Sequence, residues 1–218
     1  MKNRLIIALG LLILLTTYNP QKLPLITKFN IKEINIENNL ILNNQEIKKD
    51  LTFLYDTNLI FLNNTNIKKI LIEKSFVEKF EIKKIYPNKL IIKIFEKTPI
   101  AILQYKKEKY YIDKNIDLID YRDLDIYKNL PVVFGSKENF ENLYNVLIKI
   151  NFPFNLIKKF YLYESKRWDL EILENKIIKL PAKDYVKSLE NFMILIKDNS
   201  FDKYQSFDYR INNQLILK

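Results

Sequence analysis

Residues 76–96 read FVEKFEIKKIYPNKLIIKIFE, and this stretch decides the fold of the first half of the chain. Apolar and charged residues alternate over 76–85 and again over 90–96, a pattern that predicts two β-strands. The four residues between them, Tyr86-Pro87-Asn88-Lys89, have the composition of a tight turn. The stretch therefore predicts an antiparallel hairpin.

One strand and two short helices are predicted before this hairpin. Apolar residues alternate in part over 28–37, which predicts a strand. Helices are predicted at about 43–53 and 63–72, because each segment begins with asparagines that can accept backbone N–H groups at a helix start. Together these elements give residues 28–98 the order β-α-α-β-β.

Residues 99–218 predict a β-rich domain with two helices. Apolar residues at helical spacing predict a helix that begins after Ser136 and buries Phe140 and Leu143. A second amphipathic helix is predicted at about 183–197. Strands are predicted at 100–105, 109–113, 157–163, 167–173, 176–180, 206–211 and 214–217. The predicted fold class is α+β.

The amino terminus has the pattern of a targeting segment. Residues 1–4 are basic, and residues 5–17 are apolar except for the threonines at their end. Residues 16–20, TTYNP, offer no A-x-A cleavage site. We therefore favour a signal anchor over residues 1–18, while a cleaved signal peptide and an upstream start codon remain open. Because the basic residues come first, the positive-inside rule places the amino end in the cytoplasm and the rest outside.

The length of this apolar segment is short for a membrane span. Thirteen helical residues reach about 20 Å, whereas the hydrocarbon core is about 30 Å thick. An anchor of this kind needs its polar ends to snorkel to the headgroups.

Composition excludes several kinds of site. The 218 residues contain no cysteine, no histidine and only two glycines. Thiol nucleophiles, Ser-His-Asp triads, ordinary zinc sites and glycine-rich phosphate loops are therefore excluded. The net charge is +10, but Ile, Lys and Asn together make up 91 residues. This bias points to an A/T-rich genome, so we do not interpret the charge as a nucleic-acid footprint.

The densest acidic stretch is Asp113, Asp117, Asp120, Asp123 and Asp125. Paired carboxylates can act as acid and base in glycoside hydrolysis. The spacing also imitates the start of a calcium loop, but the chain has leucine at both positions where that loop needs glycine and a bidentate acid. We interpret the stretch as a solvated turn after a hairpin.

Seven short motifs occur in a fixed order along the chain. They are the opening strand at 29–39, the hairpin at 85–92, EKTPIA at 96–101, YID at 111–113, LPVVFG at 130–135, RWDLE with IKLP over 167–181, and FDYR at 207–210. In this order the chain resembles the FtsQ/DivIB family of bacterial cell division proteins. It departs from the family where turn glycines are replaced by Asn38, Asn115 and Lys176.

The resemblance implies an architecture and a function. Residues 1–18 would be a single-pass anchor in the inner membrane, 28–98 a POTRA domain, and 99–218 a β-rich domain in the periplasm at the division septum. The function implied is a non-enzymatic divisome scaffold without cofactor or metal. Its partners would be FtsB and FtsL and, through them, the septal peptidoglycan synthase, but not nucleic acid.

Two other classes of function stay open beside the scaffold. An exported peptidoglycan hydrolase would use the acidic stretch and would need a cleft that holds a carboxylate of raised pKa. A POTRA-bearing outer-membrane assembly or secretion protein would show repeated POTRA units, and the sequence contains no internal repeat.

Five residues are candidates for partner binding. Phe207, Tyr209, Arg210 and Ile211 lie on the predicted strand 206–211, which could form an exposed edge and accept a strand of a partner. Trp168 is the only tryptophan, and exposed tryptophans often anchor interfaces. For Trp168 we prefer a place in the core.

Overall fold

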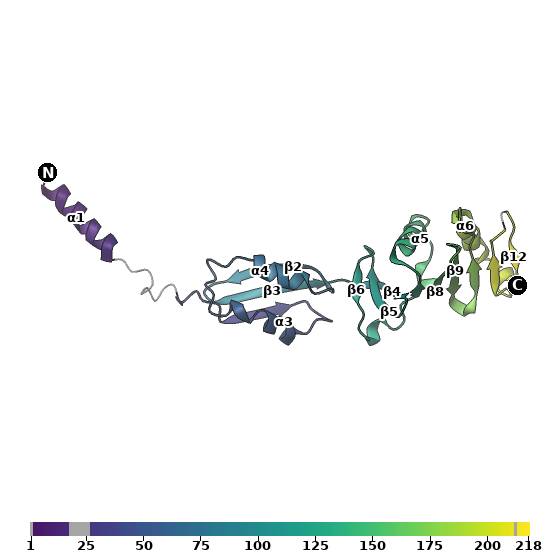
Figure 1. The fold of residues 1–218 in the computed structure, drawn as a ribbon, viewed down its shortest axis with the longest axis horizontal. Coiled ribbons are helices and arrows are strands. Elements are labelled where there is room, and N and C mark those ends of the chain that lie inside the picture. The colour runs from purple at the N-terminus through teal and green to yellow at the C-terminus, as the bar shows by residue number, and fades with distance from the viewer. Residues whose placement is uncertain (1, 18–26, 212) are drawn as a thin grey trace. The chain divides into compact units, whose positions relative to one another are not determined.

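The computed structural model describes residues 2–17, 27–211 and 213–218, and its contacts divide the chain into two units, Met1–Glu96 and Lys97–Lys218. The first helix, α1 (Lys2–Thr17), has 16 residues (Figure 1). The described residues hold no helix with both the length and the apolar character needed to cross a membrane. Residues 1 and 18 of the predicted anchor lie outside the described residues.

The first unit contains a three-stranded sheet with the order β1-β3-β2. β1 (Glu33–Glu37) is parallel to β3 (Lys89–Glu96), and β2 (Val77–Ile85) is antiparallel to β3. Ile85 lies opposite Lys89, so the predicted hairpin is confirmed.

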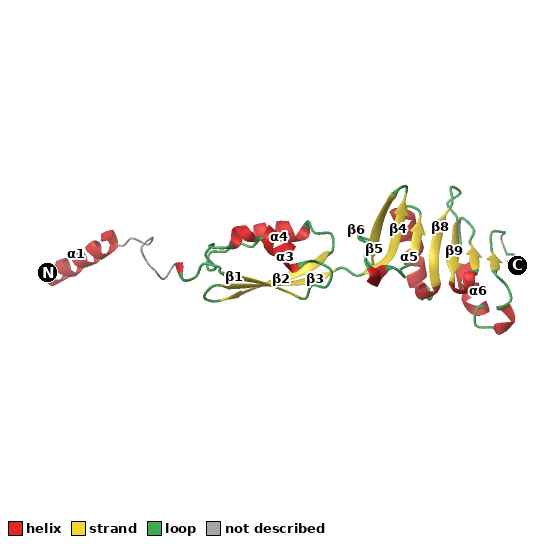
Figure 2. Ribbon diagram, turned by 90° about the horizontal axis from the view of Figure 1, so that it is seen from below, coloured by secondary structure: helices red, strands yellow, loops and turns green. Residues whose placement is uncertain are grey.

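Two helices cover one face of this sheet, α3 (Asn44–Asp50) and α4 (Thr65–Ile72), as Figure 2 shows. α3 begins directly after Asn43 and ends before the predicted residue 53, and α4 begins directly after Asn64. The side-chain oxygen of Asn43 accepts a backbone N–H at 2.7 Å, and that of Asn63 accepts one at 3.0 Å. These contacts satisfy N–H groups that have no partner inside a helix. The predicted β-α-α-β-β order is confirmed.

The second unit is built on a nine-stranded sheet with the order β12-β11-β10-β9-β8-β7-β4-β5-β6. β6 and β7, with three residues each, lie outside the strands that were predicted from the sequence. The strands are β4 (Pro99–Tyr105), β5 (Glu108–Asp113), β6 (Leu118–Asp120), β7 (Val132–Phe134), β8 (Ile157–Leu162), β9 (Trp168–Ile172), β10 (Ile177–Lys179), β11 (Ser206–Asp208) and β12 (Ile216–Leu217).

Helices α5 (Lys137–Lys149) and α6 (Val186–Leu195) lie on one side of this sheet (Figure 1). Ser136 caps α5 as predicted, because its hydroxyl accepts the Asn139 N–H at 3.4 Å. The second helix is shorter than the predicted 183–197. Both helices contribute to the same core cluster as the strands, among others through Phe140, Leu143, Leu189 and Phe192.

Gly135 is required because a side chain would not fit at this position, and not because of a left-handed backbone. A Cβ at this position would lie 2.9 Å from Leu162 Cβ and 3.1 Å from Trp168 Cη2. The ring of Trp168 also packs edge-on against Phe160, with 6.4 Å between the ring centroids. Trp168 is 3 % exposed, so the core placement that we preferred is confirmed.

The turns without glycine behave differently from one another. Asn38 adopts the left-handed conformation with φ 64°, which asparagine tolerates. At the second turn the left-handed residue is Ile116 rather than Asn115. At the third turn Glu174 and Asn175 are left-handed, while the buried Lys176 pairs with Glu174 at 3.0 Å.

Only the first part of the acidic stretch forms the turn that we expected, because Asp120 ends β6 and Asp125 begins a short 3-10 helix. Asp113 is buried, and its Oδ1 accepts the backbone N–H groups of Asn115 at 2.9 Å and Asp117 at 2.8 Å. The other four aspartates are exposed. Asp113 therefore shapes the turn from inside, and the described residues contain no group of three or more side chains suited to hold a metal ion.

Candidate partner-binding edge

The nine-stranded sheet ends on β12 in the part of the chain that the structure describes. β11 is parallel to β10 on one side, and β12 is antiparallel to β11 on the other, with Leu217 opposite Phe207. The expectation that residues 206–211 form the edge is therefore wrong by one strand. A strand that lies between two others has no free row of backbone groups to offer a partner.

The hydrogen bonds of β12 show which of its backbone groups face outward. Ser206 and Lys218 exchange two bonds, with N–O distances of 3.0 and 3.1 Å. In an antiparallel pair such residues alternate with residues whose N–H and C=O point the other way. The N–H and C=O of Leu217 therefore point away from β11, toward the free side of the sheet.

A groove lies between α6 and the chain that leads into β12. Its volume is about 810 Å³. Tyr209 borders it, and the Tyr209 hydroxyl donates to Asn191 Oδ1 on α6 at 2.9 Å. Burial raises the pKa of this hydroxyl above its ordinary value. The groove is lined by Pro181, Lys183, Asp184, Val186, Lys187, Ser188, Glu190, Asn191, Tyr209, Ile211, Asn213, Gln214 and Leu215.

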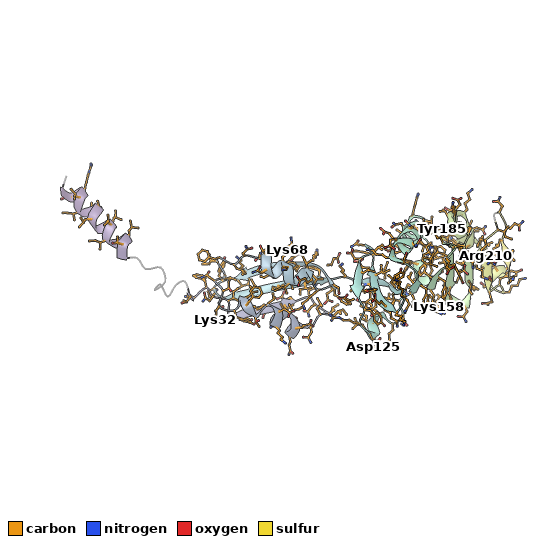
Figure 3. The ribbon with its side chains drawn as sticks, in the orientation of Figure 1. Lys32, Lys68, Asp125, Lys158, Tyr185 and Arg210 are labelled. Atoms are coloured by element: carbon orange, nitrogen blue, oxygen red, sulfur yellow. The ribbon has the colours of Figure 1, made fainter. Side chains whose placement is uncertain are left out.

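A row of charged residues crosses three neighbouring strands toward this edge. Lys179 on β10 lies opposite Asp169 on β9 and beside Asp208 on β11. Arg210 Nε donates to both carboxylate oxygens of Asp208, at 2.8 and 3.0 Å. These bonds hold the pKa of Asp208 below its ordinary value. Because Asp208 lies opposite Ile216, the guanidinium is held near β12. Figure 3 labels Arg210 toward the carboxyl end of the chain.

The pKa of Asp169 shifts in the opposite direction from that of Asp208. Burial raises the pKa of its carboxyl, although Arg167 and Lys179 act the other way. Its Oδ1 lies 3.7 Å from Arg167 Nε and accepts no hydrogen bond. The raised pKa therefore belongs to a residue within the sheet.

The structure divides the five predicted site residues into two groups. Phe207 and Trp168 are 2 % and 3 % exposed, so their side chains belong to the core. Tyr209 and Ile211 line the groove, and Arg210 is exposed. The last three lie at the edge, although none of them is on its outermost strand.

The sequence predicted the strand 214–217 and the second helix, but it did not predict Leu217 or the residues of α6 as parts of the site. The signal for Leu217 was present, because a turn at 212–213 followed by QLILK indicates a returning strand. Asn213 is left-handed and the Gln214 N–H reaches the Ile211 carbonyl at 3.1 Å, while Asn212 lies outside the described residues. The helix residues carry no such signal, since only the folded chain brings α6 beside the edge.

Comparison with known protein families agrees with this architecture. A model of the POTRA domain of FtsQ type matches residues 29–97. A model of the C-terminal domain of cell division proteins FtsQ/DivIB matches residues 101–210. The two models follow each other in the order that the sequence motifs indicated.

Individual relatives carry the same name. Cell division protein FtsQ of Rickettsia typhi is 27% identical over 190 residues, which cover 83% of this chain and 71% of that protein. Cell division protein DivIB of Clostridium tetani is 27% identical over 160 residues, 69% of this chain and 60% of that protein. The solved extracytoplasmic domain of DivIB from Geobacillus stearothermophilus covers 46% of this chain and 92% of its own, with 10% identity and a TM-score of 0.33. Since the FtsQ/DivIB model alone spans half of the residues, the chain belongs to the FtsQ/DivIB family of cell division proteins.

Proposed function

We propose that this protein is a non-enzymatic scaffold of the divisome, which binds partner proteins through the edge at β12. The supporting observation is the outward-facing backbone of Leu217 beside the groove under α6. Strand addition at such an edge supplies main-chain hydrogen bonds for affinity, and pockets for alternate side chains supply specificity.

The geometry suggests what an incoming strand would meet. Leu217 packs partly against the core, on the side of the sheet that carries α6. The neighbouring Ile216 lies opposite Asp208, on the side of the Asp208–Arg210 pair. Because side chains alternate along a strand, one row of the partner would face the groove and the other would face Arg210. A partner with apolar residues in one row and an acid in the other fits best.

The family suggests the identity of the partner and the compartment. FtsB would supply the strand, together with FtsL, and these proteins would connect the scaffold to the septal peptidoglycan synthase. Residues 1–18 would anchor the chain in the inner membrane with the amino end in the cytoplasm. In support, Leu5 and Leu15 on α1 are 66 % and 74 % exposed, and apolar side chains of this kind favour a lipid environment.

The hydrolase alternative receives less support from the geometry. It placed a carboxylate of raised pKa in a cleft of the acidic stretch. Asp113 there is engaged by two backbone N–H groups, and the raised pKa lies on Asp169 within the sheet. We therefore assign no catalytic role to either residue.

The test is a calorimetric titration of the full chain, in lipid nanodiscs, with the exported part of FtsB from the same organism. Leu217→Pro removes the outward N–H and places a ring on the edge, so binding should weaken by at least about tenfold. Leu217→Ala is the matched control, because it shortens the same side chain and keeps the N–H. It should retain most of the affinity.

Circular dichroism of both variants shows whether the sheet is intact. Equal affinities of Leu217→Pro and the unchanged protein, with both folded, would contradict strand addition at β12. In that case Arg210 and Ile211 would be the next residues to replace, since both are exposed beside the groove.

A further inference from the structure

Three chain segments meet at one end of the three-stranded sheet, the end where β1 and β3 begin. The Leu59 N–H donates to the Phe29 carbonyl at 2.8 Å, and the rings of Phe29 and Tyr86 pack edge-on at 6.1 Å. Lys84 Nζ donates to the Leu62 carbonyl at 3.2 Å. The entry segment, the loop between the helices and the β2–β3 turn therefore form one connected surface.

This surface carries large apolar side chains that face solvent. We call it the apolar tip, and it consists of Phe53, Tyr55, Ile60, Phe61 and Tyr86. Phe61 is 79 % exposed, Tyr86 57 % and Ile60 46 %. A cluster of exposed aromatic and aliphatic residues on a small module marks an interaction site.

The loop that carries Ile60 and Phe61 is well packed on the rest of the module. Leu59 and Leu62, on either side of Ile60 and Phe61, are buried, with exposed fractions of 0 % and 9 %. The Asn58 side chain accepts the Ile60 N–H at 2.9 Å and fixes the turn of the loop. The loop thus packs into the core through Leu59 and Leu62, while Ile60 and Phe61 between them face solvent.

Positive charge surrounds the apolar tip. The three segments 28–33, 52–64 and 82–90 contain five lysines and two carboxylates, a net charge of +3. One carboxylate, Glu33, is paired with Lys89 at 2.9 Å. Lys28, Lys32 and Lys83 are exposed, and Figure 3 labels Lys32 at this end of the module. At the opposite end of the sheet, segments 36–43, 73–79 and 94–96 have a net charge of −2.

We infer that the apolar tip docks on the surface of an anionic lipid bilayer. Ile60, Phe61 and Tyr86 would enter the interface between headgroups and acyl chains, where aromatic side chains are favoured. The lysines around them would contact lipid phosphates and extend their apolar stems along the interface. This inference rests on the proposed function, in which residues 1–18 anchor the chain in the membrane.

Chain connectivity favours lipid as the occupant. The chain from α1 enters the module at Phe29, whose ring contacts Tyr86 of the apolar tip, and ten peptide units join Thr17 to Thr27. They can span at most about 35 Å. If α1 is in the bilayer, the tip stays near the lipid surface, and even weak docking gains from this high effective concentration.

The absence of cysteine from the sequence makes a direct test possible. Phe61→Cys introduces one thiol that can carry an environment-sensitive fluorophore on the full chain in nanodiscs. Leu40→Cys is the matched control, because Leu40 is an apolar loop residue, 89 % exposed, at the opposite end of the same sheet. The discs contain phosphatidylcholine alone or with phosphatidylglycerol.

Docking predicts a blue-shifted emission and quenching by headgroup-labelled lipid for the label at 61, and neither for the label at 40. The effect should grow with phosphatidylglycerol. Lys32→Gln and Lys83→Gln should lower the ratio of docked to free tips roughly fivefold for each lysine removed.

Co-flotation of the chain with vesicles tests the anchor separately. A chain that floats while its label at 61 emits as in water would overturn lipid docking and leave the proposed anchor standing. That result would favour a protein as the occupant of the tip. A chain that does not float would overturn both the proposed anchor and lipid docking, since neither α1 nor the apolar tip would then hold the chain at the bilayer.

Discussion

β2 forms one edge of the three-stranded sheet and β12 forms one edge of the nine-stranded sheet, and these two edges differ in length and charge. β2 is nine residues long and contains five charged residues, whereas β12 is two residues long and apolar. Long edge strands invite unwanted pairing, and charged side chains along them prevent it. The two-residue edge β12 carries no charged side chain of this kind, and it is the edge at which we propose that a partner strand adds.

The outward face of β2 shows how this protection is built. Lys79, Glu81 and Lys83 lie opposite Phe95, Lys93 and Ile91 of β3. The ammonium group of Lys79 lies 4.4 Å from the centroid of the Phe95 ring, so it covers an apolar residue and also keeps a charge on the edge. The comparison teaches that an unpaired edge alone does not identify a binding site.

The largest expected effect comes from the residue behind the β12 edge. Phe207 packs edge-on against Phe192 of α6, with 5.0 Å between ring centroids, and is 2 % exposed. Phe207→Ala should cost the second unit about 3–5 kcal/mol through the lost burial and the cavity that remains. Chemical unfolding followed by fluorescence of Trp168 measures it.

Binding at β12 should be lost with that unit, while the first unit keeps its stability. A probe in the first unit, such as a label at position 40, provides the control. If Phe207→Ala weakened FtsB binding without lowering the free energy of unfolding, Phe207 would be a contact residue after all, as the sequence suggested.

A second prediction breaks the protection of β2. Lys79→Val with Lys83→Val removes two of the five charges from the edge and places an apolar residue on each side of Glu81 on that face. The variant should associate through β2, since the free backbone groups are then flanked by apolar side chains. Light scattering against concentration should show dimers or larger species.

Lys93→Val is the matched control for this edge. It removes a charge from the same face but from the central strand β3, so it should stay as monodisperse as the unchanged protein. Equal behaviour of the two variants would mean that edge charge does not control association here.

Local patterns in the sequence determined most of the fold but not the position of the edge. Alternation revealed the β2–β3 hairpin, and caps at Asn43 and Ser136 marked helix starts, because these signals act between residues close in sequence. The parallel pairing of β10 with β11 joins residues almost thirty positions apart, and no local pattern records it. Because β12 also pairs with the other side of β11, Phe207 lies on an interior strand and Leu217 lies at the edge.

The smallest expected effect concerns the two aspartates on either side of Lys179. Arg210 lowers the pKa of Asp208, so this carboxylate stabilises the fold above the unfolded pKa of about 3.9 and loses that contribution as pH falls through its lower folded value. Burial raises the pKa of Asp169, so its charge costs stability at neutral pH, and the cost disappears as pH falls through the raised value toward about 3.9. At pH 7, Asp208→Asn should therefore lower the free energy of unfolding by roughly 1 kcal/mol, and Asp169→Asn should raise it slightly.

Urea unfolding of both variants between pH 3 and pH 7 separates the two carboxylates. The difference between Asp169→Asn and the unchanged protein should shrink already above pH 4, and that of Asp208→Asn only below it. Asp208→Asn should also weaken partner binding, because it frees the Arg210 guanidinium that lies near the base of β12. Unchanged binding with reduced stability would restrict the Asp208–Arg210 pair to a structural role and leave the β12 edge to act through its backbone and the groove alone.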